Sequence, residues 1–216
     1  MREHFAKQIE DVKHKVLRMG AMVENIISIS VDALKNQDLE LAKKVYAEDD
    51  RIDEIELEIE KECMSLLALQ QPLAKDLRTI ATVLKIITDL ERMGDHAVNI
   101  SKITLEIGKD KLIKPLIDIP KMAVMCQEMV RMSLDAFVKE NVSLAEEAAG
   151  KDQQVDDIYE EIVKELLHII SEDSLNINQG TKLLFVGRFL ERIADHATNI
   201  CERLIYMVTG ELKKIN

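Results

Sequence analysis

Carboxylate side chains recur four residues apart in two nearly identical segments that lie 100 residues apart in the chain. Residues 89–100 read Asp-Leu-Glu-Arg-Met-Gly-Asp-His-Ala-Val-Asn-Ile, and residues 189–200 read Phe-Leu-Glu-Arg-Ile-Ala-Asp-His-Ala-Thr-Asn-Ile. Residues four apart lie on one face of a helix, so the Glu, Asp and Asn of each segment form one stripe. Two carboxylates in this arrangement repel each other by roughly 0.2–0.5 kcal/mol. A stripe that occurs twice with its flanking residues therefore suggests that each copy binds a positive group.

Each half of the chain carries a second acidic pair with the same spacing, Asp49 with Asp53 and Asp152 with Asp156. A rotation of about 100° per residue places these acids on the surface or at a groove and not in the core. Clusters of carboxylate oxygens suit hard or borderline cations such as magnesium, calcium, manganese or iron. His96 and His196 follow the aspartates directly and are expected only at the rim of such a site. The predicted metal ligands are Asp49, Asp53, Glu91, Asp95, Asp152, Asp156, Glu191 and Asp195.

Other interpretations stay open, because acids on an exposed helix face usually serve only to solvate it. In that case Arg92 would pair with Asp95, and Arg188 with Glu191, three residues along the helix. The sequence has no phosphate-binding loop, no G-x-S-x-G and no H-E-x-x-H, so we do not expect an enzyme. A metal-dependent oxidoreductase or metal-storage bundle is the alternative, although a di-iron bundle would carry inward-facing Glu-x-x-His. A plain helical scaffold is the third interpretation.

The composition favours long helices. Of 216 residues, 47% are hydrophobic and 32% are charged, with seven glycines, three prolines and no tryptophan. A sheet would need more aromatic and turn residues than this. The net charge of −11 argues against nucleic-acid binding, which needs a basic face, and suits cations or the basic surface of a partner.

The cysteines and the apolar segments indicate a cytoplasmic protein. Cys63, Cys126 and Cys201 are far apart and form no C-x-x-C motif, so we expect buried thiols in a reducing compartment. The N-terminal segment has no apolar signal region, and no stretch approaches the 18 or so apolar residues of a membrane span.

Apolar residues recur at the helical period of three and four along most of the chain. Asp38 and Asn141 suit helix N-caps, Gly108 and Gly210 suit C-terminal caps, and Gly150 is expected inside a helix. Residues 109–120, which contain two of the three prolines, form the expected linker, and residues 171–179 a polar loop. The predicted helices cover residues 4–36, 38–69, 73–107, 120–139, 141–170 and 180–209.

The second half of this pattern repeats the first. Asp49 and Asp53 align with Asp152 and Asp156, and the acidic stripes of the third and sixth helices align with each other. The fold class predicted from this duplication is all-α, with two tandem three-helix bundles built from six long helices. The expected domains are residues 1–110 and 121–216, joined by a linker at 111–120.

These segments resemble the PhoU family, the regulatory proteins of phosphate transport. The resemblance rests on the paired segments at 89–100 and 189–200, on residues 72–78 (Pro-Leu-Ala-Lys-Asp-Leu-Arg), on both aspartate pairs and on the linker at 114–120. It covers residues 4–210, nearly the whole chain. Thr88 departs from its counterpart Arg188, so the two acidic faces are not equivalent.

The resemblance implies a cytoplasmic negative regulator of phosphate uptake and of the phosphate-starvation response. It implies an adaptor between the ATPase subunit of a phosphate ABC transporter and a sensor histidine kinase, which meets the membrane only through these partners. It also implies metal ions on the eight acids (iron, zinc, manganese or magnesium), with no organic cofactor, and a homodimer among the assemblies to be tested.

Overall fold

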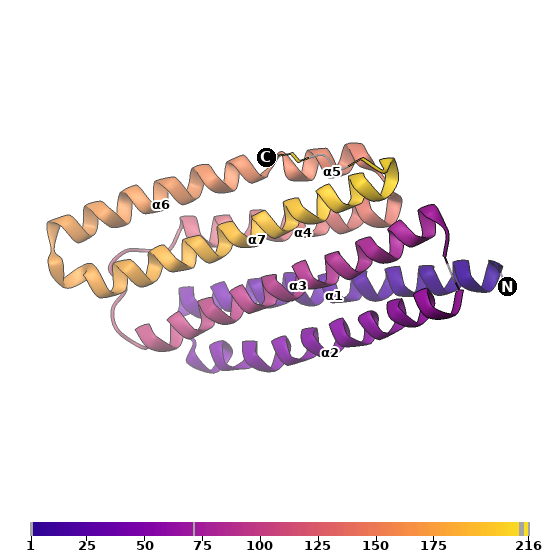
Figure 1. Ribbon diagram of the computed structural model, residues 1–216. Coiled ribbons are helices and arrows are strands. Elements are labelled where there is room, and N and C mark those ends of the chain that lie inside the picture. The colour runs from indigo at the N-terminus through magenta and orange to yellow at the C-terminus, as the bar shows by residue number, and fades with distance from the viewer. Residues whose placement is uncertain (1, 71, 212–213, 216) are drawn as a thin grey trace.

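The computed structural model describes residues 2–70, 72–211 and 214–215, and within these it is all-α, as predicted. Figure 1 shows α1, α2 and α3 as one group of helices and α4 to α7 as another, with α3 and α7 side by side between them. The helices are α1 (Arg2–Asn36), α2 (Leu39–Gln70), α3 (Ala74–Ile107), α4 (Asp118–Lys139), α5 (Val142–Ala149), α6 (Asp152–Glu172) and α7 (Ile177–Thr209), with a short 3₁₀ turn at Ser174–Asn176.

The apolar periodicity of each helix becomes its buried face. On α2 the residues Val45, Ile52, Ile59 and Leu66 follow one another at intervals of seven and are all buried. This spacing keeps one narrow stripe of a long helix in contact with its neighbours, as in bundles with knobs-into-holes packing. The opposite face of α2 is left free for charged side chains, including the acids singled out above.

Polar side chains fix the helix ends where the sequence predicted them. Asp38 Oδ1 accepts hydrogen bonds from the backbone N–H of Leu41 at 2.9 Å and of Glu40 at 3.1 Å. Asn141 Oδ1 likewise accepts from the N–H of Leu144 at 3.1 Å, ahead of α5. These bonds satisfy N–H groups that have no partner within the helix. Gly210 ends α7 with a φ of +80°, a conformation that favours glycine.

The prediction of one helix over residues 141–170 was wrong, because α5 ends at Ala149 and α6 begins at Asp152. Gly150 and Lys151 form a tight turn in which the Lys151 N–H bonds to the carbonyl of Ala148 at 3.2 Å. Glycine in a helix interior lowers stability by roughly 0.5–1 kcal/mol relative to alanine, and the helix is interrupted at this glycine. Lys151 then pairs with Glu128 of α4 at 3.1 Å.

The start of α4 and the start of α7 also differ from the prediction. The helix predicted to begin at residue 120 begins at Asp118, since proline is tolerated in a first helical turn. The polar loop at 171–179 is mostly helical, and α7 begins at Ile177.

The two three-helix units pack through α3 on α7 and α1 on α4. α3 and α7 run antiparallel, with Arg78 donating to the carbonyl of Met207 at 3.2 Å and Lys182 to that of Glu106 at 3.3 Å. Buried side chains of both units join in one core. The division into domains 1–110 and 121–216, joined by a linker at 111–120, stays a prediction.

The three cysteines are free thiols buried in this core, as predicted. None of the helices that the structure describes is both long and apolar enough to cross a membrane.

Candidate functional site

Four of the predicted ligands face one another between α2 and α3, and we call them the first acidic cluster: Asp49, Asp53, Glu91 and Asp95. Asp49 and Glu91 are half-buried; the Glu91 side chain is 20% exposed, compared with 47% for Asp95. Besides burial, the largest cause, the charges of Asp53 and Asp95 raise the pKa of Asp49 and of Glu91, and the charge of Asp95 raises that of Asp53. The i, i+4 spacing on each helix therefore places both pairs along one seam.

The surroundings of the first acidic cluster disfavour the ionised form of its carboxyl groups. Burial is the largest cause and the charge of Asp53 the next, and together they raise the pKa of Asp49 to about 6. Burial, followed by the charge of Asp95, raises the pKa of Glu91 to about 7. A raised carboxyl pKa means that the folded protein disfavours the ionised form. The cluster thus holds more negative charge than its surroundings neutralise.

Two small residues of α3 give this cluster its shape. Gly94 lies against Asp49, and a Cβ at position 94 would stand 2.7 Å from Asp49 Oδ1. The missing side chain therefore lets the carboxylate lie directly on α3. Thr88 donates a hydrogen bond to Glu56 Oε1 at 3.4 Å.

Glu56 is a fifth acid at this place, which the sequence analysis missed. Its pKa is raised mainly by burial and also by Asp53, and its charge acts in turn on Glu91. The available signal was its position three residues after Asp53, which puts it on the same face of α2.

Among the described side chains, arginine contacts the first cluster only from its outer side. Arg92 Nη1 lies 3.1 Å from Asp95 Oδ2, and Arg92 Nε lies 3.3 Å from Glu91 Oε2. The Arg92 side chain is 57% exposed, so solvent screens these contacts. The predicted Arg92–Asp95 pair is present, yet burial and repulsion still outweigh its effect on the pKa of Glu91.

The second half forms a smaller cluster between α6 and α7, which we call the second acidic cluster: Asp156, Glu191 and Asp195. Arg188 forms an ion pair with Glu191, whose side chain is 13% exposed, as the sequence predicted for these two residues. Burial followed by the charge of Asp195 raises the pKa of both Glu191 and Asp156, and Arg188 opposes the rise in each. This cluster therefore contains its own cation.

Asp152, the fourth acid expected in the second half, is buried, contrary to the prediction that all eight acids lie at the surface. It begins α6 directly after the turn at Gly150. Burial first, and then the charge of Asp152, raise the pKa of the Cys126 thiol. The break in the helix turns this residue toward the core, which helical periodicity alone does not reveal.

The donor set of both clusters consists of oxygen atoms, which fits hard or borderline cations. Within the described part of the chain, no three His, Cys, Asp or Glu side chains already stand in an arrangement that could hold a metal ion. Ligation by the first cluster requires its side chains to converge further. Asp49 is already held against α3 at Gly94, whereas Asp53 is exposed and Asp95 is paired with Arg92 on the outer side.

The two histidines lie at the contact between the units and not at the rim of the acidic clusters. His196 Nδ1 is 2.8 Å from Asp89 Oδ1, while the His96 ring stacks on Phe189 with centroids 5.7 Å apart. Burial lowers the pKa of His96 to about 4. Positions 89 and 189 are where the repeated segments differ most, and each contacts the histidine of the other segment.

Comparison with known proteins shows the family to which this chain belongs. A model of the PhoU domain matches the chain twice, over residues 16–104 and 119–204. The chain belongs to the PhoU family. Each of the two PhoU-domain matches contains one acidic cluster.

Curated PhoU proteins match the chain over nearly its whole length. A protein of Clostridium acetobutylicum named as a homologue of the phosphate-specific transport system accessory protein PhoU is 42% identical over 216 residues, all of this chain and 99% of its own. PhoU of Escherichia coli is 35% identical over 207 residues, covering 96% of this chain and 86% of its own.

Solved PhoU structures have the same fold. The crystal structure of PhoU from Pseudomonas aeruginosa superimposes with a TM-score of 0.91 at 36% identity, over 96% of this chain and 100% of that one. PhoU from Streptococcus pneumoniae gives a TM-score of 0.90 at 33% identity, over 97% and 99%.

Proposed function

We propose that this member of the PhoU family is a regulatory accessory protein of a phosphate-specific transport system and not an enzyme. The observation that carries the proposal is its similarity, over the whole length, to curated proteins named as accessory proteins of that system. With phosphate in excess, it binds the transporter's ATPase subunit and a sensor histidine kinase in the cytoplasm. It thereby limits phosphate uptake and represses the starvation response.

The surface of α2 supports a role in protein contacts. Leu57 and Met64 lie seven residues apart on this helix and are 49% and 54% exposed, so they share one solvent-facing stripe. Exposed acids, among them Glu54 and Glu58, lie beside them. Apolar anchors with a charged rim are typical of protein interfaces, and this rim would complement a basic surface on a partner.

The test is the phosphate response of a host from which this gene has been deleted. Grown in excess phosphate, the deletion strain is expected to show high alkaline phosphatase activity and raised phosphate content, both restored by the wild-type gene. Normal repression in the deletion strain would contradict the regulatory role, provided that no second PhoU gene is present. Pull-downs from phosphate-replete cells should recover the ATPase subunit and the kinase; recovery of neither contradicts the adaptor role.

We also propose that the first acidic cluster holds a divalent cation. Asp49, Asp53, Glu91 and Asp95 would be its ligands, and the ion would neutralise carboxylates that now repel one another. The proposal is supported by the raised pKa of Asp49 and of Glu91 and by the space that Gly94 leaves for Asp49. A bound ion of this kind would fix the surface that α2 and α3 present to partners.

Paired substitutions in the two clusters test this proposal on the purified protein. Glu91→Ala with Asp95→Ala is expected to weaken Mn²⁺ binding by about tenfold or more, the range found when the environment of a metal site is disrupted. The matched control, Glu191→Ala with Asp195→Ala, should change Mn²⁺ binding much less, because Arg188 already offsets part of the negative charge of that cluster. Equal effects of the two pairs, measured by calorimetry, would contradict a site in the first cluster.

A further inference from the structure

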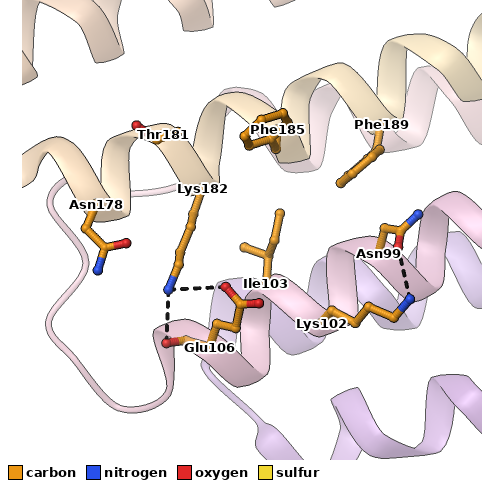
Figure 2. A pocket seen from close by; sticks show the side chains of 9 residues that line it. All are labelled: Asn99, Lys102, Ile103, Glu106, Asn178, Thr181, Lys182, Phe185 and Phe189. Atoms are coloured by element: carbon orange, nitrogen blue, oxygen red, sulfur yellow. Dashed lines mark hydrogen bonds and ion pairs between the residues drawn. The ribbon is translucent and has the colours of Figure 1, made fainter.

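A groove of about 560 Å³ separates the end of α3 from the beginning of α7. Figure 2 shows Phe185 and Phe189 of α7 above Ile103 of α3, with lysines at its edges. A volume of this size is within the range of small-molecule sites, which combine an apolar lining with a few polar groups. Two other grooves of similar volume lie between α1 and α2; one is lined mainly by charged side chains, and the other by a mixture of charged, polar and aliphatic side chains. The groove between α3 and α7 therefore differs from the other two in the residues that line it and not in its volume.

The apolar wall of the groove is a row of aromatic rings. Phe185 and Phe189 stack with centroids 6.4 Å apart, and His96 continues the row behind Phe189. Phe185 is 53% exposed, in a chain that has four phenylalanines and no tryptophan. Exposing a phenylalanine ring to water is unfavourable, and a planar ligand that covered the ring would remove this cost.

The charge of the groove is positive, although the whole chain carries −11. Lys182 pairs with Glu106 at 3.3 Å, so these two charges offset each other. Lys102 instead donates to the amide oxygen of Asn99 at 3.2 Å, so among the described residues it has no direct ion pair at the edge of the groove, although its charge also acts on Asp49 of the first acidic cluster. The groove therefore offers one ammonium group beside an aromatic wall.

The equivalent positions in the other repeat do not repeat this lining. Lys85 and Asp89 stand where α7 has the two phenylalanines, and Glu202 stands where α3 has Lys102. The duplicated scaffold accordingly has this combination of aromatic rings and a cation on one side only. Such a difference is not needed for packing, because Phe185 and Lys102 are both exposed.

We infer that this groove binds a nucleoside phosphate, with the base on the Phe185 and Phe189 rings and the phosphate at Lys102. Every base has a flat apolar face that stacks on aromatic side chains, and an ammonium group is a common partner of phosphate. Asn178 and Thr181 at the same groove supply polar groups for the sugar or the base edge. The inference goes beyond the proposed function and does not depend on it.

The binding experiment uses the purified full chain with AMP in a buffer that contains EDTA, so that metal-dependent binding is excluded. Calorimetry is expected to show one saturable site per chain for AMP. Adenosine lacks the phosphate and inorganic phosphate lacks the base, so each alone should bind at least about tenfold more weakly. NMR should show upfield shifts of the adenine protons, as expected for a base lying on an aromatic ring.

Variants of exposed groove residues locate the site. Phe185→Leu keeps an apolar side chain but removes the ring, and Lys102→Gln removes the charge; each should weaken AMP binding about tenfold. The matched controls are Leu167→Ala on α6, which is 54% exposed, and Lys85→Gln on α3, and neither should change it. Circular dichroism should show all four variants folded.

Three results would overturn the inference. One is the lack of saturable AMP binding up to about 1 mM. Another is equal binding of inorganic phosphate and AMP, which would indicate an anion spot without a base site. The third is AMP binding that neither Phe185→Leu nor Lys102→Gln weakens.

Discussion

The two acidic clusters occupy equivalent places in the two repeats but differ in how their charge is balanced. In the second cluster, Arg188 pairs directly with Glu191, and Tyr159 packs against α7 at Gly187. In the first, Thr88 stands at the position of Arg188, and the acid Glu56 takes the place of Tyr159. These two exchanges give the first cluster an additional acid and leave it without an inner arginine.

This difference shows that a duplicated motif can keep its spacing while its electrostatics diverge. The i, i+4 acids are present in both repeats, yet the pKa of Glu91 is raised to about 7 while the rise for Glu191 is opposed by Arg188 through both charge and a hydrogen bond. An added cation should therefore stabilise the first cluster more than the second.

Exchanging the inner arginine between the repeats should have the largest effect. Thr88→Arg places a guanidinium group beside the first cluster and is expected to lower its Mn²⁺ affinity about tenfold. The reason is that the arginine charge stabilises the ionised acids in the absence of metal, so a bound ion has less charge left to neutralise. Arg188→Thr should raise the affinity of the second cluster. Calorimetric titration of both variants measures the change, and unchanged affinities in both would refute the comparison.

Glu91→Gln should change the pH dependence of stability. The pKa of Glu91 rises from an ordinary value of 4.5 to about 7 on folding, so its charge destabilises the native state increasingly as pH rises across that interval. Removing the charge should increase the free energy of unfolding by about 1 kcal/mol at pH 8, after allowance for solvent screening. Near pH 4 the effect should vanish.

Urea unfolding in EDTA at the two pH values measures this difference. Glu191→Gln is the control and should give a smaller gain, because it leaves Arg188 without its partner. A gain from Glu91→Gln that is the same at pH 4 and pH 8 would show that charge is not its cause.

Gly94→Ala should have the smallest effect. A Cβ at position 94 would displace the Asp49 carboxylate, which lies 2.7 Å away, while alanine also favours the helix by roughly 0.5–1 kcal/mol. We expect little net change in stability and about threefold weaker Mn²⁺ binding. The counterpart Ala194→Gly should cost stability and leave Mn²⁺ binding unchanged; if both variants behave alike, Gly94 has no special role.

Much of the fold could be predicted from the sequence because its signals are local. The period of the apolar residues located the long helices, and Asp38 and Asn141 marked helix starts that the structure confirms. The duplication was visible because both acidic pairs recur in order. These features depend on neighbours within one or two helical turns.

Several failures of prediction arise from contacts between distant segments. Whether a helix continues through Gly150 depends on what α5 and α6 pack against, and this break decided that Asp152 is buried. His96 and His196 follow the acidic motif in sequence, yet each meets a residue of the other repeat, Phe189 and Asp89 respectively.

The sequence by itself determined most of the helices, their caps, the duplication and the identity of the acids, because each of these features depends on the types of residues a few positions apart. Only the tertiary structure decided which acids are half-buried, which have an arginine beside them, and that a groove lined by Phe185 and Lys102 lies between the repeats. The physical reason is that burial and charge balance are properties of surfaces brought together from different helices.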